Sequence, residues 1–238
     1  MIRAVQLGLK QIAITDHGFR HFVYNVRRMD WPVVRREVAF LRTKYPQIEI
    51  LLGLETNINS FGGNIDIKEA DVEVLDVVLA AYHKSVLPAN VFDIYKFSLP
   101  NLWAGVTKKS SAKLVARNTD AYIKAIEKYD IDVIAHPNFG IKFDILEVAR
   151  ACARFGTMME LSGRKIKMTD AEIEAAADAG VYFIMNSDAH KPDDIGRVDA
   201  AVETVRRIGL PFERVANWDK LPVFRSRLAK LGRTKIFR

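Results

Sequence analysis

Short apolar runs alternate with helical patterns along the whole chain. Six of these runs have the length and composition of buried strands, and each ends at or near a His, Glu or Asp residue. Because parallel strands need crossover helices between them, this alternation predicts an α/β fold with a parallel sheet. The expected strands are Gln11–His17, Ile48–Glu55, Val77–His83, Asp132–Pro137, Met158–Ser162 and Tyr182–His190.

The segments between these strands carry helix signals. Thr169 and Glu172 form a capping box, and Gly180 stops the helix that follows. The other expected helices run from Pro32 to about Tyr45, from Ser111 to about Tyr129, over Ile145–Phe155 and over about Val198–Ile208. No linker, repeat or low-complexity segment divides the pattern. We therefore expect one domain over residues 1–238.

Two segments do not fit the alternation. Thr56–Lys68 is polar and contains Gly62-Gly63, which predicts a hairpin excursion. Pro88–Lys109 mixes aromatic residues with Pro100 and Gly105. It fits a loop lid beside a site and fits a packed insertion equally well.

Composition narrows the classes of protein. The chain has 238 residues, of which 49% are hydrophobic, so it can bury a substantial core. It has no apolar run of about eighteen residues, which excludes a membrane span and gives no reason to expect a membrane partner. The single cysteine, Cys152, rules out internal disulfides and favours the cytoplasm.

The positive charge is concentrated near the C-terminus. The chain carries a net charge of +7, and residues 206–238 alone carry +8 through ten basic and two acidic side chains. This segment predicts a basic helix with a solvated tail. The alternative is a contact with nucleic acid or another partner.

The strand ends carry the candidate chemistry. All strands of a parallel barrel open onto one face at their C-terminal ends, and that face holds the active site. Each side chain alone has an ordinary explanation, such as a core histidine or a surface acid, but six at strand ends favour metal binding. Imidazole and carboxylate without thiolate suit Zn, Mn or Fe ions. The candidate ligands are His17, Glu55, His83, His136, Asp188 and His190.

Other motifs limit the reaction. The chain has no GxxxxGK[ST] phosphate loop and no GxSxG nucleophile elbow. Clustered metals instead suit hydrolysis of a phosphate ester, in which one ion activates a water and others neutralise the phosphoryl oxygens. Arg164 and Lys165 follow a strand end and are candidates for gripping phosphate. A solvated loop is the alternative for these two residues.

The motifs together resemble the PHP (polymerase and histidinol phosphatase) family, especially its stand-alone phosphoesterases. The match rests on TDHG at 15–18, GLE at 53–55, His83, AHP at 135–137 and SDAH at 187–190. The resemblance implies a distorted seven-stranded (βα) TIM-like barrel with up to three metal ions. It further implies that Glu55 bridges two ions, that His83 and His136 complete one, that Asp188 serves the other, and that His17 and His190 share a third.

One motif of the family has no match. The family opens with His-x-His on its first strand, and Met1–Lys10 holds no His, Asp or Glu. These residues look like the end of a helix without an N-cap, so the sheet is expected to lack its first strand. A start placed too late or a truncated chain explains this better than a degenerate member.

Two further residues are weaker candidates. Glu160 either supports a metal ligand by hydrogen bonding or is a buried acid at a strand end. His21 lies four residues beyond His17, in a loop, and is a candidate for touching substrate.

The function expected is metal-dependent hydrolysis of a small phosphomonoester, with Asp188, His190 and Arg164 as catalytic residues. Loss of the opening motif would impair it. One alternative is a 3′-end nuclease or phosphodiesterase that uses the basic C-terminus to hold nucleic acid. Another is a non-catalytic binding subunit with a relic metal site. The sequence leaves the substrate and the oligomeric state open.

Overall fold

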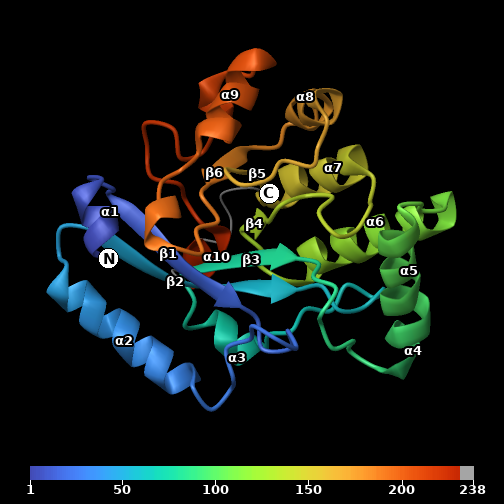
Figure 1. Cartoon of the computed structure of the whole chain (residues 1–238), viewed down its shortest axis with the longest axis horizontal. Helices are drawn as coiled ribbons and strands as arrows, with labels where there is room; N and C mark the ends of the chain where they lie inside the picture. Colours follow the sequence, from blue (N-terminus) through green and yellow to red (C-terminus); the bar gives the residue numbers. More distant parts are fainter. Residues whose placement is uncertain (231–238) are drawn as a thin grey trace.

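A computed structural model describes residues 1–230 of the chain. Six parallel strands lie in the order β1-β2-β3-β4-β5-β6 and curl into a half-barrel (Figure 1). The strand predictions are confirmed, although the third, fourth and sixth strands are shorter than expected. The strands are β1 (Gln11–His17), β2 (Glu49–Asn57), β3 (Val77–Ala81), β4 (Val133–Ile134), β5 (Met158–Ser162) and β6 (Phe183–Asn186).

The expected helices are also confirmed, and they cover the outer face of the sheet. Ser111 and Thr169 each accept a hydrogen bond from the first turn of the helix they precede, and Thr169 and Glu172 form the predicted capping box. No helix among the described residues is long and apolar enough to cross a bilayer. The longer helices are α2 (Trp31–Lys44), α5 (Leu99–Thr107), α6 (Ala112–Lys128), α7 (Ile145–Phe155), α8 (Asp170–Asp178) and α9 (Asp199–Arg207); the shorter ones are α1 (Ile2–Gln6), α3 (Glu69–Val72), α4 (Val91–Asp93) and α10 (Arg225–Lys230).

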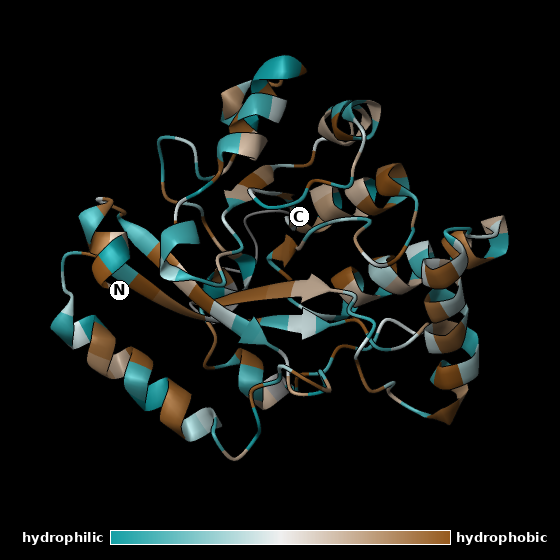
Figure 2. Ribbon diagram, in the orientation of Figure 1, coloured by the Kyte–Doolittle hydropathy of each residue, from teal (hydrophilic) through white to brown (hydrophobic). Residues whose placement is uncertain are grey.

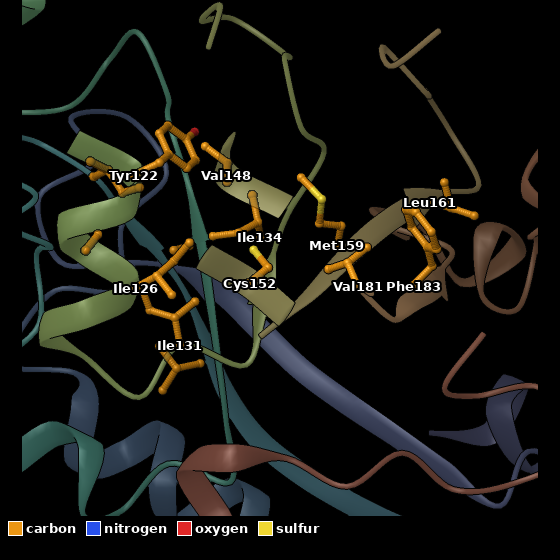
Figure 3. Packing of buried hydrophobic residues seen from close by; sticks show 14 of the residues in the cluster. Tyr122, Ile126, Ile131, Ile134, Val148, Cys152, Met159, Leu161, Val181 and Phe183 are labelled. Atoms are coloured by element: carbon orange, nitrogen blue, oxygen red, sulfur yellow. The ribbon is translucent and has the colours of Figure 1, made fainter. Parts of the chain in front are cut away.

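Alternate residues of each strand form two separate hydrophobic cores. One set faces the helices; Figure 3 shows Ile134, Met159 and Phe183 in this larger cluster, with side chains from α6 and α7. Figure 2 shows hydrophobic and hydrophilic residues mixed along the helices that surround the sheet. The other set fills the inside of the half-barrel and consists of Leu51, Val77, Leu79, Ala81, Val133, Ala135, Met158 and Ile184, with Phe224 packed among them.

The two edges of the sheet differ. On the β6 side, Val215 forms a parallel bridge with Phe183, and the Asn217 side chain both accepts from the Met185 N–H and donates to the Met185 carbonyl. On the β1 side, no strand of the described residues pairs beyond Gln11–His17. The structure therefore shows six strands in a half-barrel, and the seven-stranded barrel stays a prediction.

The two segments that did not fit the strand–helix alternation fold differently. Thr56–Lys68 turns back on itself through a bridge between Ile58 and Ile65, as the hairpin prediction requires. Of the two alternatives for Pro88–Lys109, the structure agrees with the packed insertion, because residues 91–107 form one helical run of α4, a π-helical turn (Ile94–Ser98) and α5. Pro100 does not break this run, since it lies in the first turn of α5.

The base of the half-barrel is closed by the segment that leads into α10. Phe224 enters the inner core, and the next turn is held by the buried carboxylate of Asp132. This carboxylate accepts from the backbone N–H of Ser226 (2.9 Å), the Ser226 hydroxyl (2.6 Å) and the backbone N–H of Val78 (2.7 Å). One acid therefore joins β3, the start of β4 and the C-terminal helix. The predicted basic tail continues into 231–238, which lie outside the described residues.

Replacing Asp132 with alanine should destabilise the fold by about 3 kcal/mol, because buried donors on Ser226 and Val78 lose their acceptor. Urea unfolding followed by circular dichroism measures the change. Asp130→Ala is the matched control, since Asp130 pairs with Arg225 at 3.0 Å but is partly exposed. This control should cost about 1 kcal/mol or less. Equal losses in the two variants would contradict the role given to Asp132.

Candidate metal centre

Glu55 lies at the centre of a histidine cluster at the C-terminal mouth of the half-barrel. Its Oε1 is 2.7 Å from Nε2 of His136 and 3.7 Å from Nε2 of His83. Its Oε2 is 3.2 Å from Nδ1 of His17. The side chains of all four residues are largely buried. The cluster thus joins the ends of β1, β2, β3 and β4.

The strand register places these residues together. His17 pairs with Glu55 across β1 and β2, and Glu55 follows Leu51 and Gly53 along the inner face of β2. A Cβ atom on Gly53 would come within 2.6 Å of the Val77 side chain and 2.7 Å of the Thr15 side chain. Glycine at 53 therefore lets the three strands approach closely just below the cluster.

The pKa values of Glu55 and His83 are strongly shifted. Burial raises the pKa of Glu55, but the hydrogen bond with His136 and the charges of His83, His136 and His17 outweigh burial and lower it to about 2. Burial lowers the pKa of His83 to about 3, although Glu55 opposes this. Near neutral pH the site therefore contains an ionised carboxylate beside a neutral imidazole.

A chain of hydrogen bonds orients His83. The Asn57 amide donates through Nδ2 to Asp66 (2.7 Å), so its Oδ1 faces Nδ1 of His83 at 2.7 Å. An amide oxygen only accepts, so Nδ1 of His83 carries the proton and Nε2 carries the lone pair. Asp66 also accepts from the N–H of Asn57 and Arg20. Gly18 leaves room for it, since a Cβ there would lie 2.3 Å from the Asp66 carboxylate.

The lone pairs at the centre of the cluster could bind a cation. The lone pair on His83 Nε2 and the carboxylate of Glu55 are both acceptors, and they face each other across 3.7 Å. His17 Nδ1 is buried and makes no hydrogen bond. One ligand atom from each of His17, Glu55 and His83 lies within 4.8 Å of the other two. Neutral imidazoles with a carboxylate are ligands for Zn and similar transition metals.

His136 completes the cluster under backbone strain. Its φ of 31° is in the left-handed region, which a non-glycine residue rarely adopts. The buried Glu160 holds this conformation by accepting from the His136 N–H at 2.7 Å and from Asn186 Nδ2 at 3.0 Å. Burial raises the pKa of Glu160 to about 7. These hydrogen bonds favour the interpretation in which Glu160 positions a site residue, His136, over that of a buried acid at a strand end.

Arg164, Asp188 and His190 form a second cluster at the ends of β5 and β6. Arg164 Nη1 lies 2.7 Å from Nδ1 of His190 and 3.6 Å from the Asp188 carboxylate. Burial, and next the charge of Glu55, raise the pKa of Asp188. In the described chain no hydrogen bond or ring contact joins His190 to His17, so their shared ion stays a prediction. Lys165 packs over the ring of Phe139, which itself contacts His136.

His21 lies against His17 and His83 but makes different hydrogen bonds. Its ring stacks on His17 at 4.6 Å and lies 5.5 Å from the ring of His83. Its Nδ1 accepts from the backbone N–H of Tyr24 (3.0 Å) and of Val23 (3.3 Å). Those N–H groups can only donate, so the His21 proton resides on Nε2. This tautomer makes His21 a hydrogen-bond donor toward the site.

Sequence comparisons identify proteins similar to this chain. The chain is 30% identical over 231 residues to a probable phosphatase of Shewanella loihica, covering 90% of this chain and 79% of that protein. It is 32% identical over 232 residues to a probable phosphatase of Edwardsiella ictaluri, covering 90% and 80%. No family model matches the chain.

A solved structure has the same fold. The histidinol phosphate phosphatase of Lactococcus lactis, crystallised with zinc, L-histidinol and phosphate, superposes with a TM-score of 0.57. The match covers 88% of this chain and 86% of that one, at 13% sequence identity. At that identity the likeness shows a shared fold.

Replacing Asn57 with alanine should weaken zinc binding by about 10- to 100-fold, because His83 loses the acceptor that fixes its tautomer and orientation. Isothermal titration with zinc measures the change. Asn64→Ala is the control, since Asn64 lies on the same excursion and its side chain contacts only the exposed Lys128. Unchanged zinc affinity in Asn57→Ala would show that the hydrogen bond does not tune the ligand.

Proposed function

The chain belongs to the PHP family of phosphatases, and from that premise we propose that it hydrolyses a small phosphate monoester with the help of bound divalent metal ions. The observation that carries the proposal is the partly buried group of His17, Glu55 and His83, in which one ligand atom from each residue lies within 4.8 Å of the other two. His136 adds a further imidazole beside Glu55, with its Nε2 2.7 Å from Oε1. The proposed ions are Zn, Mn or Fe, chosen for their affinity for imidazole and carboxylate.

The proposed ligand set is that expected from the sequence. Glu55 would bridge two ions, with His83 and His136 near its Oε1 and His17 near its Oε2. Asp188 and His190 complete the set from β6. Metal ions held there supply Lewis acidity, which lowers the pKa of water and neutralises phosphoryl oxygens.

The remaining residues bind and orient the substrate. Arg164 presents a partly exposed guanidinium beside Asp188, where its planar donors suit phosphoryl oxygens. His21 offers the N–H of its Nε2 to the phosphoryl oxygens of the substrate. His190 is more exposed than the other site histidines and lies at the rim, where Arg164 is 2.7 Å from its Nδ1.

The phosphatase proposal takes precedence over the two alternatives. The curated relatives named above are probable phosphatases. The relic-site alternative expects ligands to be lost, whereas Glu55 and the histidines around it keep a bonded, buried arrangement.

Glu55→Gln should lower hydrolysis of p-nitrophenyl phosphate by about 1,000-fold or more, because the amide cannot bridge cations. Activity is measured on protein reloaded with Zn or Mn after EDTA treatment, with metal content measured in parallel. Glu49→Gln, at the other end of the same strand, is the matched control and should keep near-normal activity. If reloaded, metal-bound wild-type protein hydrolyses no phosphomonoester across a substrate panel, the proposal fails.

His21→Phe should raise the KM for phosphomonoesters about tenfold while leaving metal content unchanged, because His21 donates to substrate and does not bind metal. Steady-state kinetics and elemental analysis separate these effects. His17→Phe serves as the contrast, since it should lose metal as well as activity. Loss of metal in His21→Phe would show that the assigned tautomer is wrong.

A further inference from the structure

The helical run over residues 91–107 buries two polar side chains as well as Phe97 on its inner face and carries large apolar side chains on its outer face. It stands at the edge of the molecule, beyond the C-terminal ends of β2 and β3 (Figure 1). Its fully buried positions are Asp93, Phe97 and Asn101, which recur every four residues. An ordinary surface helix places its apolar residues at such positions.

The inner face is anchored by specific hydrogen bonds. Asp93 accepts from the backbone N–H of Phe61 at 3.0 Å. Asn101 and Asn118 exchange two amide hydrogen bonds, of 2.9 and 2.8 Å. Asn90 caps the start of the run by accepting from Phe92 and Asp93. Turning the helix would leave these buried groups unpaired, so its orientation is fixed.

The outer face is a continuous apolar stripe. Seven large apolar side chains of the run are between 46% and 70% exposed, and Lys96 is the one charged residue among the exposed positions. A stripe of this size on a surface marks an interaction site. We define the stripe by these residues: Val91, Phe92, Tyr95, Leu99, Leu102, Trp103 and Val106.

The surroundings of the stripe are basic. Residues 84–117 contain six basic side chains, and the only acidic one is the buried Asp93. Beside Trp103, a groove of about 400 Å³ between α5 and α6 is lined in part by Lys109, Lys113 and Arg117. No acidic residue of the described chain lines this groove. The stripe therefore suits an apolar partner with a negatively charged surface.

Two other partners fit less well. A second copy of the chain would bring the same basic side chains against each other without exposed acids from this segment to pair with them. Nucleic acid would satisfy the cations, but the aliphatic residues Leu99, Leu102 and Val106 can neither stack on bases nor hydrogen-bond to them.

We propose that this face binds the surface of an anionic phospholipid membrane. The stripe enters the boundary between headgroups and acyl chains, and the cations in and around the groove contact lipid phosphates. Trp103 and Tyr95 are residue types that favour this boundary. The proposal departs from the expectation of no membrane partner, which rested on the lack of a spanning segment. It is independent of the proposed phosphatase activity.

Flotation with vesicles of 70% phosphatidylcholine and 30% phosphatidylserine tests the proposal. The full chain should float with these vesicles, bind pure phosphatidylcholine vesicles about tenfold or more weakly, and dissociate at high salt. Leu102→Glu with Trp103→Glu should reduce binding about tenfold or more, and so should Lys109→Glu with Lys113→Glu. Circular dichroism confirms that each variant is folded.

Two controls match these changes on the opposite side of the molecule, on α2. Phe40→Glu places a charge at an exposed apolar residue, and Arg35→Glu with Arg36→Glu reverses two exposed cations. Both should leave binding unchanged. Absence of flotation at low salt overturns the proposal, as does equal loss in the controls. A dimer in solution that Leu102→Glu with Trp103→Glu makes monomeric, without vesicle binding by the parent, assigns the face to a second copy instead.

Discussion

The candidate site depends on the parallel register of β1, β2 and β3. Side chains alternate between the two faces of a strand, so a shift of one residue in β2 would turn Glu55 toward the helices and bring Leu54 to the mouth. The inner core holds the register, because Leu51 packs with Val77 and Leu79 below the site. The absence of a side chain at Gly53 then lets the strands approach each other. Packing below the mouth thus determines where the carboxylate lies.

The hydrogen bonds around the cluster have a common effect: each removes a choice of protonation or orientation. Asn57 fixes the proton of His83 on Nδ1, and the backbone N–H groups of Val23 and Tyr24 fix that of His21 on Nε2. The two rings are 5.5 Å apart, yet one presents a lone pair and the other a proton. Adjacent histidines are thereby suited to different tasks, one to binding a cation and the other to binding an oxygen.

The sequence predicted the strand ends well because ligand-type residues there interrupt strongly apolar runs, as His83 does after Val77–Ala81. It could not identify Asn57 and Asp66, whose polar segment shows no periodicity that distinguishes buried from exposed residues. The helix over 91–107 was missed for a related reason. Its aromatic residues are mixed with Pro100 and Gly105, and nothing in the pattern shows that Asp93 and Asn101 face inward. Pairing between distant segments, such as Asn101 with Asn118, determines this orientation.

The helical run over residues 91–107 is connected along the chain to the mouth of the half-barrel. The chain passes from His83 through Val86, which bridges to His21, and then enters the apolar run at Val91. Phe22 and Tyr24, on the loop paired with this segment, are themselves highly exposed. The peptide that holds His21 in place is therefore continuous with the surface that is suited to lipid. Glu55 and the histidines that contact it are held by the ends of the strands, so their arrangement does not depend on this surface.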